Sequence, residues 1–541
     1  MVRGVEVASS WGSILLLITD TLISYFCKRK ISRTIVMLNT VRSSLKNGLV
    51  YGLGNIAVKV IGFLLIPLYT DPQFFSIDDF GIMGLLDISG LVLTAFLASS
   101  LPQSLTRWYW DKDHLNNQKA VFFMTLAAQV IISISFCLLL FPFANHFSML
   151  IFGEPDWSRA INLVILAASL QSINNIINTL MRLQSRSLLY TFVNFSKLII
   201  VLSLTIFMIV GKKMGIEGIY LAQVTGNLLF LIFLLGYTIK NCRISFDKTI
   251  IKSMFIFGIP LILANISGAA LNVIDRYSLN SLALLKYVAL YTLAFKISSV
   301  LKLVIVDSIK MAIAPLMIQK IDASDNKRFY SKVLLYSSYI LMIGIIVISL
   351  FSYELIKVIT KSNQYWEAYI IIPILCLSVF FVNLKDITVY GLFITKRTRI
   401  IGVIVTVATI LNLLLNFALI PLWGIIGAAI STLLAQLFYW YITYFFSQKK
   451  YFIPYENKKI FLVLIIGTII SCSSFFINDL PLIMRLLIKT FCVISFPFIL
   501  YFFKFYEPIE LQSIRGFVVK WSKIKNFKHN LNSLKGIREE V

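Results

Sequence analysis

The chain has few charged residues, and acidic ones are the scarcest. Only 14% of its 541 residues are charged, and 25 Asp and Glu stand against 50 Lys and Arg. A soluble domain of this length would need far more polar residues to cover its surface, so soluble classes are excluded. The basic excess does not indicate a nucleic-acid partner, because the Lys and Arg lie mainly between apolar runs, as the positive-inside rule requires.

Residues that would support catalysis or metal binding are also few. The three histidines are isolated from one another, and the six cysteines show neither metal-ligand spacing nor a disulfide framework. No Walker A sequence is present, which excludes ATP as the direct energy source, and no nucleophile–base set is visible. The sequence therefore predicts a transporter that is not an enzyme and that uses no cofactor and no resident metal.

Long apolar runs dominate what is present, since 58% of the residues are hydrophobic. From Asn47 onward, fourteen stretches are long enough to span a membrane. They cover residues 48–69, 81–102, 119–143, 160–181, 188–210, 216–239, 253–274, 287–317, 330–352, 366–394, 399–420, 424–446, 460–477 and 481–503. The predicted fold class is an all-α polytopic membrane protein with about fourteen transmembrane helices.

Charge in the connections predicts the topology. With fourteen spans, nearly all basic clusters fall on one side, which places both termini in the cytoplasm; Lys212, Lys213 and Glu217 fit this scheme least well. The apolar segment Trp11–Cys27 does not fit it. It is interpreted as a fifteenth span, as a signal peptide, or, preferably, as part of an untranslated segment 1–36 preceding a start at Met37.

Short matches separated by 209 positions indicate an internal repeat. Asp87-Ile88-Ser89 corresponds to Lys296-Ile297-Ser298, and Gly215-Ile216-Glu217-Gly218 to Gly424-Ile425-Ile426-Gly427. An even number of spans per half makes this a parallel repeat, in which substrate binds between the halves. The predicted units are an N-terminal extension 1–46, a first six-helix half 47–240, a second six-helix half 241–447, two extra helices 448–505 and a basic cytoplasmic tail 506–541.

Lysines within the apolar spans are the main candidate binding residues. A cation at the bilayer centre costs roughly 2.5–3.5 kcal/mol, so it faces a polar cavity or a partner. Lys59 shares a helix face with Asn55, and Lys197 lies in the fifth predicted span. The alternative for Lys59 is a bond to neighbouring carbonyl groups or to a carboxylate elsewhere. These residues are predicted to contact an anionic substrate.

The eighth predicted span carries further charges. At 100° per residue, Lys296, Asp307 and Lys310 share a narrow stripe, and Lys302 points away from it. Lys310 either faces the cavity or extends to the headgroups. Because Asp87 and Lys296 occupy equivalent repeat positions, we expect them to pair between the halves and to act as a gate. The candidate residues for gating or for coupling to H⁺ or Na⁺ also include Asp275, Asp307 and Asp386, and Asp87 is a candidate for both roles.

Each of the other polar residues in the spans has two possible roles. Asp275 ends the seventh span as a coupling residue or an interfacial one, and Asp386 with Lys385 forms a buried charge pair or bonds separate partners. Asn174 and Asn178 contact sugar or bond to neighbouring helices. Arg107 meets the substrate diphosphate or anchors at the interface.

The chain resembles the bacterial polysaccharide transport family of oligosaccharide flippases, in the multidrug/oligosaccharidyl-lipid/polysaccharide exporter superfamily. The resemblance covers about residues 37–506 and is carried by these motifs: Ser44-Leu45-Lys46-Asn47-Gly48-Leu49-Val50-Tyr51-Gly52, Ser104-Leu105-Thr106-Arg107-Trp108-Tyr109, Phe257-Gly258-Ile259-Pro260 before Asp275-Arg276, and Gly424-Ile425-Ile426-Gly427-Ala428-Ala429.

The resemblance implies a function. It implies export of undecaprenyl-diphosphate-linked oligosaccharide units of O-antigen, capsule or exopolysaccharide across the bacterial inner membrane. The expected partners are this lipid-linked oligosaccharide, the bilayer, H⁺ or Na⁺, a polysaccharide polymerase and a chain-length regulator. A peptidoglycan lipid-precursor flippase and a multidrug cation antiporter stay open as alternatives; Lys59 argues against the antiporter, which would need acidic cavity residues.

Overall fold

The computed structural model describes residues 63–98, 101–111, 117–319, 326–395, 397–508 and 511–512, and every element in these ranges is helical. Eleven of the helices described there are long and apolar enough to cross a membrane. The predicted all-α membrane class is therefore confirmed. The count of fourteen spans stays a prediction, because most of the first predicted span and the segment 1–36 lie outside the described residues.

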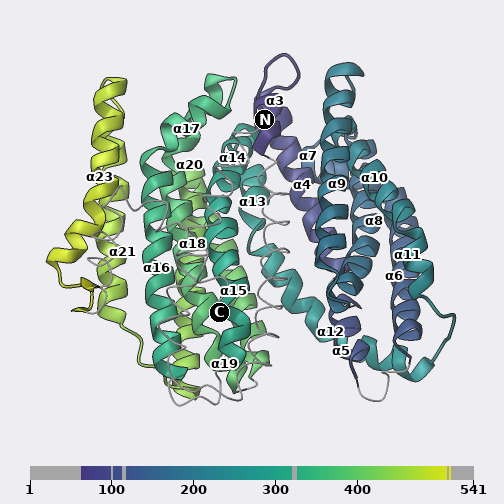
Figure 1. The fold of residues 1–541 in the computed structure, drawn as a ribbon. Coiled ribbons are helices and arrows are strands. Elements are labelled where there is room, and N and C mark those ends of the chain that lie inside the picture. Colours follow the sequence, from purple (N-terminus) through teal and green to yellow (C-terminus); the bar gives the residue numbers. More distant parts are fainter. Residues whose placement is uncertain are drawn as a thin grey trace, which may run out of the picture.

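The helices of the first half stand together on one side of the molecule (Figure 1). Their bounds are η1 Phe63–Leu65, α3 Ile66–Tyr69, α4 Ile77–Leu97, α5 Leu101–Tyr109, α6 Gln118–Leu140, η3 Phe141–Phe143, α7 Ala144–Phe152, α8 Ser158–Leu183, α9 Ser187–Ile206, the π-helical η4 Phe207–Gly211, α10 Gly215–Phe233 and α11 Leu235–Asn241. Ser76 and Asp79 form a capping box that begins α4, with Ser76 N donating to Asp79 Oδ2 at 2.8 Å.

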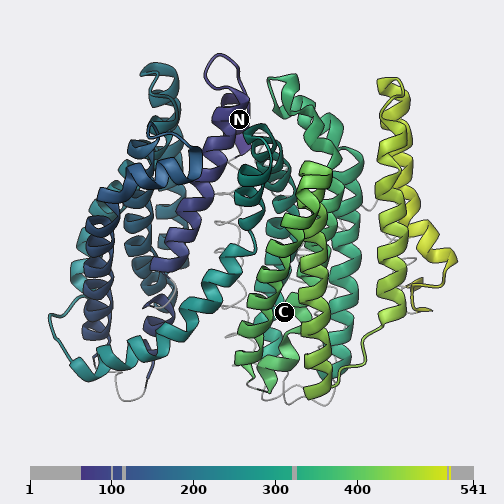
Figure 2. The same ribbon diagram turned by 180° about the vertical axis from the view of Figure 1, so that it is seen from behind.

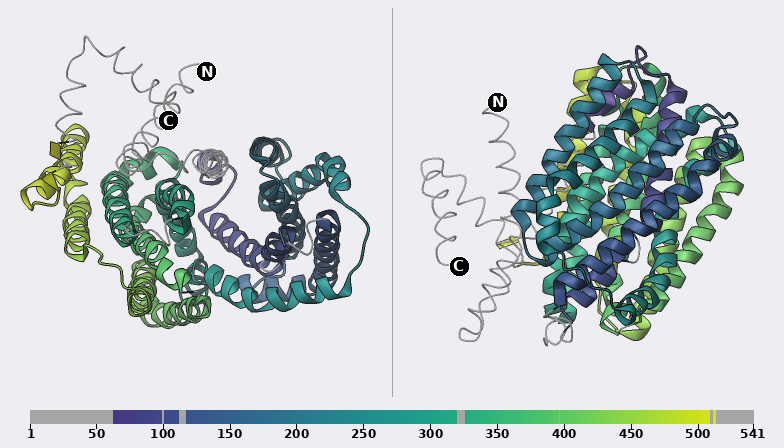
Figure 3. Two further views of the ribbon diagram at one scale, coloured as in Figure 1. Left: turned by 60° about the horizontal axis from the view of Figure 1, so that its bottom comes forward. Right: turned by 90° about the vertical axis from the view of Figure 1, so that its right-hand side faces the viewer.

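The second half and the extra helices follow. Their bounds are α12 Lys248–Ala270, α13 Ile274–Leu282, α14 Leu285–Leu301, the π-helical η5 Lys302–Asp307, α15 Ser308–Gln319, α16 Asn326–Leu350, α17 Ser352–Ile359, η6 Asn363–Ile370, α18 Ile372–Thr388, α19 Tyr390–Ile394, α20 Thr398–Lys450, α21 Asn457–Cys472, α22 Ser474–Ile477 and α23 Leu482–Phe502. Helix α12 runs obliquely at the lower end and bridges the two groups of helices (Figures 2 and 3).

Two glycines at equivalent points of the predicted repeat both have positive φ. Gly215 begins α10 with φ 60°, and Gly424 interrupts α20 with φ 54°. Only glycine adopts this left-handed region without a steric penalty from Cβ. Gly424 divides α20 where the sequence places the boundary between two spans, and both glycines stand at the same point of the repeat.

Two further glycines allow the halves to pack closely. A Cβ on Gly81 of α4 would lie 2.7 Å from the carbonyl oxygen of Leu285, and one on Gly84 would lie 2.5 Å from Thr292 Oγ1. Small residues let membrane helices approach each other at such distances. Helices α4 and α14 therefore meet closely along their upper turns, which is where the two halves join (Figure 1).

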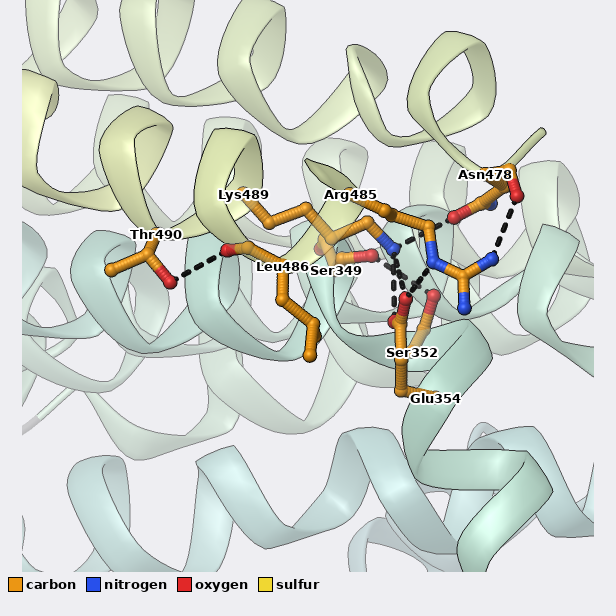
Figure 4. A network of polar contacts seen from close by, with 8 residues as sticks. All are labelled: Ser349, Ser352, Glu354, Asn478, Arg485, Leu486, Lys489 and Thr490. Carbon is orange, nitrogen blue, oxygen red and sulfur yellow. Dashed lines mark hydrogen bonds and ion pairs between the residues drawn. The ribbon is translucent and has the colours of Figure 1, made fainter. Parts of the chain in front are cut away.

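An ion cluster fixes the extra helices to the second half at the upper end. Glu354 of α17 lies 2.7 Å from Arg485 Nε and 2.8 Å from Lys489 Nζ, both on α23 (Figure 4). Asn478 closes the cluster by accepting from Lys489 at Oδ1 (2.7 Å) and from Arg485 at its carbonyl oxygen (2.8 Å). Lys489 is 0% exposed, so this cluster is part of the packed interior.

A second cluster holds the same helices at the lower end. Lys332 of α16 lies 2.7 Å from Glu456, which precedes α21, and also contacts Glu507, which follows α23. Burial opposes ionisation of Glu456, but hydrogen bonds from Lys332 and Lys459 outweigh it and hold the pKa of its carboxyl below the usual range. The extra helices are thus bonded to the second half at both ends.

Candidate functional site

A cavity of about 600 Å³ lies among α4, α5, α8, α10 and α12. We call it the amide cavity, because six amide side chains line it: Gln103, Gln171, Asn175, Gln223, Asn227 and Asn265. Thr94, Tyr220 and Asp87 add polar groups, and the remaining wall is formed by small or aliphatic residues of α4 and α8. Its volume lies within the range of small-molecule binding sites.

Asp87 and Lys296 form an ion pair beside this cavity. Lys296 Nζ of α14 lies 3.4 Å from Asp87 Oδ2 of α4, and Tyr220 OH donates to Asp87 Oδ1 at 3.2 Å. The contact predicted from the repeat is therefore present, between the two halves. The side chains are 34% and 40% exposed, so the pair contributes at most about 1 kcal/mol and is easily opened. Its role as a gate stays a prediction.

Helix α13 adds a second polar connection between the halves. Tyr277 OH and Ser89 Oγ of α4 lie 2.7 Å apart. Next to it, Arg276 is only 5% exposed; its guanidinium lies 4.3 Å from the ring centre of Phe295 and acts electrostatically on Asp87. Helix α13 therefore buries both of its charged residues, Asp275 and Arg276, against other helices.

Asp275 is the most completely buried of the predicted coupling residues. It is 0% exposed, and its Oδ2 accepts from Tyr291 OH and Thr432 Oγ1, each at 2.7 Å. Its Oδ1 accepts from Asn416 Nδ2 at 2.9 Å. Asp275 thus joins α13, α14 and α20 inside the second half, and it does not line the amide cavity.

Lys197 lies behind the wall of the amide cavity. Its Nζ donates to Gln171 Oε1 at 2.7 Å and to Asn227 Oδ1 at 2.5 Å, and it lies 5.4 Å from the ring centre of Phe230. Asn174 Nδ2 donates to the same Asn227 Oδ1 at 2.9 Å. Lys197 and Asn174, both predicted from the sequence, therefore donate to Asn227 of the cavity wall and do not line the cavity themselves.

Asn178 and Arg107 lie away from the cavity wall. Asn178 and Asn194 exchange hydrogen bonds of 3.0 and 3.4 Å between α8 and α9, which is the interhelical role. Arg107 is exposed, and its guanidinium lies 4.6 Å from the ring centre of Phe257 on α12. Lys59 and Asn55 lie outside the described residues.

The predicted charge stripe of the eighth span is wrong. Lys296 faces Asp87 on α4, whereas Lys310 Nζ lies 3.3 Å from Asp386 Oδ2 on α18. Lys302 also acts electrostatically on Asp386, and Asp307 acts on Lys385. The reason is the π-helical segment Lys302–Asp307, which shifts the register that a continuous α-helix would keep.

The reading in which Lys385 and Asp386 bond separate partners is also wrong. Lys385 Nζ contacts the carboxylate of Asp386 directly, because a long, flexible lysine side chain reaches around the helix from the adjacent position. Together with Lys310, this makes Asp386 the centre of a cluster within the second half.

Sequence reasoning missed most of the cavity wall. Gln103, Gln171, Gln223, Asn227 and Asn265 were not predicted as site residues. A usable signal was present: Gln171 and Asn175, and likewise Gln223 and Asn227, stand four residues apart inside apolar spans. Paired amides at helical spacing in a membrane span define a polar face.

The sequence is similar to those of known membrane proteins. The family model described as polysaccharide biosynthesis protein matches residues 73–371, more than half of the chain. The uncharacterized membrane protein MJ1068 of Methanocaldococcus jannaschii is 23% identical over 413 residues, which cover 72% of this chain and 81% of that protein.

Solved structures share the fold at low identity. The lipid II flippase MurJ in an inward closed conformation matches with a TM-score of 0.64 at 14% identity, over 84% of this chain and 99% of that one. An outward-facing MATE family multidrug resistance transporter of the MOP superfamily gives 0.59 at 13%, over 80% and 99%. A MOP superfamily transporter from Pyrococcus furiosus gives 0.58 at 14%, over 81% and 100%. The chain belongs to the polysaccharide biosynthesis protein family, and it has the fold of MOP superfamily transporters.

Proposed function

We propose that this protein is a flippase that moves undecaprenyl-diphosphate-linked oligosaccharide units from the cytoplasmic to the outer leaflet of the bacterial inner membrane, for surface polysaccharide biosynthesis. The observation that carries the proposal is the Asp87–Lys296 pair, which joins the two halves beside the amide cavity. Family membership supports the biosynthetic role. The basic connections before α12 and α21 support an orientation in which the lower end of Figure 1 faces the cytoplasm.

Alternating access requires contacts that form in one state and break in another. In the state described here, Gly81 and Gly84 allow α4 to pack on α14 towards the upper end, and the Asp87–Lys296 pair lies about one to two helical turns farther along α4. An ion pair of this exposure is cheap to separate. Its opening would release Lys296 to meet the diphosphate of the substrate, and its closing would restore the resting contact.

Coupling to H⁺ or Na⁺ is part of the proposal. Of the predicted coupling residues Asp87, Asp275, Asp307 and Asp386, Asp275 is supported best, because its carboxylate is fully buried and accepts three side-chain hydrogen bonds. The buried guanidinium of Arg276 also acts electrostatically on it. Protonation or cation binding would change its hydrogen bonds to α14 and α20, and hence the packing of the second half.

The test is a flipping assay in liposomes with a fluorescent undecaprenyl-diphosphate-linked oligosaccharide. We expect Asp87→Asn and Lys296→Gln each to slow flipping at least about tenfold, and the exchange Asp87→Lys with Lys296→Asp to recover part of the rate. Lys286→Gln is the matched control, since Lys286 forms an exposed pair with Glu367 at 3.6 Å. Wild-type rates in both single variants would contradict the gate.

The same assay separates the alternative substrates. Lipid II and an organic cation are supplied in parallel arms, with imposed H⁺ and Na⁺ gradients. Transport of lipid II without the oligosaccharide lipid would replace the proposed function by that of a peptidoglycan-precursor flippase. Transport of the cation alone would indicate a multidrug exporter.

A further inference from the structure

Lys197 is an intramembrane cation whose acceptors are neutral. Its Nζ donates to Gln171 Oε1 and Asn227 Oδ1, and within the described ranges no carboxylate lies at ion-pair distance from it. By contrast Lys296, Lys310, Lys385 and Lys489 each contact a carboxylate. An intramembrane cation kept without a carboxylate indicates a functional use of its charge.

Lys197 also fixes the orientation of the amides around it. A lysine ammonium is a donor only, so the amide atoms that face it are oxygens. Gln171 must then turn its Nε2 away from Lys197, and this group donates to Asn175 Oδ1 at 3.0 Å. Asn175 consequently presents its Nδ2 on the other side, and among the described residues this Nδ2 has no acceptor. Because Asn175 lines the amide cavity, a chain of donors runs from Lys197 to the cavity wall.

Such a wall suits a ligand that is rich in acceptors and negatively charged. Each amide matches a sugar hydroxyl, because it offers both a donor and an acceptor. The donor chain that begins at Lys197 adds a preference for an anion, since hydrogen bonds between donors and a charged acceptor are stronger than neutral ones. The lone carboxylate of the wall, Asp87, is already paired with Lys296, which leaves the donor side without compensation.

We propose that the amide cavity binds the saccharide part of the substrate, and that Lys197, acting through Gln171 and Asn175, makes it selective for a glycan that carries a carboxylate. This inference rests on the proposed flippase function and names its substrate class: an acidic repeat unit containing a uronic acid. Lys197 is a positioning residue, and Asn175 is the residue that contacts the sugar.

The experiment measures binding, so it does not depend on transport. The full chain in nanodiscs is titrated with three probes: an undecaprenyl-diphosphate-linked glycan ending in glucuronic acid, the same glycan ending in glucose, and undecaprenyl diphosphate alone. We expect the wild type to bind the glucuronate glycan at least about tenfold more tightly than the glucose glycan, as one charge-assisted hydrogen bond provides. Lys197→Gln should remove this preference and leave the affinity for the glucose glycan within about twofold of the wild-type value.

Three variants keep the result interpretable. Lys197→Arg retains a donor-only cation and should restore the preference. Asn175→Leu should abolish the preference while Lys197 is intact. Lys212→Gln is the matched control and should bind like the wild type, because Lys212 is exposed and directly follows η4. Thermal unfolding of each variant in the same nanodiscs excludes loss of the fold.

The outcomes separate the two proposals. If the wild type binds none of the three lipids, the flippase proposal itself fails. If it binds both glycans equally, or if Lys197→Gln keeps the preference, the acidic-sugar inference is wrong. If Lys197→Gln weakens the binding of all three lipids equally, Lys197 acts on the diphosphate that they share. The assignment of the cavity to the saccharide is then overturned.

Discussion

Gln223 in the first half and Thr432 in the second half lie 209 positions apart, at equivalent points of the predicted repeat. Gln223 lines the amide cavity. Thr432 instead donates to Asp275 Oδ2 at 2.7 Å and is buried in the protein core. Two helical segments that each follow a glycine of positive φ therefore present a polar side chain to a cavity in one half and to the protein core in the other.

The two halves use their polar side chains differently. In the second half, Tyr291, Thr432 and Asn416 each donate to the buried carboxylate of Asp275. These hydrogen bonds join α13, α14 and α20. In the first half, amides on α8 and α10 are left facing a cavity. Polar groups that face a cavity are available to a ligand, whereas those closed around a buried carboxylate are not.

The largest expected effect concerns the closed ion cluster at the upper end. Glu354→Gln would leave Arg485 and Lys489 buried without their carboxylate, and removing one partner of a buried ion pair costs about 3–5 kcal/mol. We expect this loss in the free energy of unfolding, measured by denaturing-detergent titration in mixed micelles. Glu367→Gln, which removes an exposed pair, should change it by less than about 1 kcal/mol. Similar values for both variants would contradict a structural role for the cluster.

The second prediction compares the halves directly. Asp275→Ala leaves the donor groups of Tyr291, Thr432 and Asn416 without their acceptor, so we expect a loss of about 2–3 kcal/mol by the same titration. The variant Gln223→Ala, at the position that corresponds to Thr432, should lose no more than about 0.5 kcal/mol, because the Gln223 side chain borders a cavity. Equal losses would mean that the amide cavity is a structural core like that of the second half.

The smallest effect is a pH dependence at the lower end. The folded-state pKa of Glu456 is held below its unfolded value, so its contribution to stability is present above the unfolded pKa of about 4.3 and is lost as the pH falls through the folded value. The thermal unfolding temperature, measured between about pH 6 and pH 3, should fall more steeply with decreasing pH for the wild type than for Glu456→Gln. Parallel curves would show that Lys332 and Lys459 do not stabilise the carboxylate.

Some of the site could be predicted from the sequence because it follows from the repeat. Asp87 and Lys296 share one repeat position, and a parallel repeat brings equivalent positions of the two halves together near its axis. The break at Gly424 was predictable for the same reason, since Gly215 stands at the corresponding point. Both predictions rest on the number of residues between two positions in the sequence, which folding does not change.

Other features depended on details that spacing does not encode. The stripe of Lys296, Asp307 and Lys310 assumed a continuous α-helix, and the π-helical segment Lys302–Asp307 changed which neighbours these residues face. π-helical segments are rare and short, and the apolar sequence of a single span gives no sign of one. The inward turn of α13 that buries Asp275 and Arg276 is likewise a property of the assembled helices.

The sequence by itself determined the all-α membrane class, because the length of the apolar runs acts locally against the lipid. The fourteen spans and the repeat stay predictions. Only the tertiary structure decided which polar groups meet. Lys197 could be recognised in the sequence as an intramembrane cation, but its amide partners come from α8 and α10. The direction in which those amides point depends on that contact, because a donor-only ammonium orients whatever it touches.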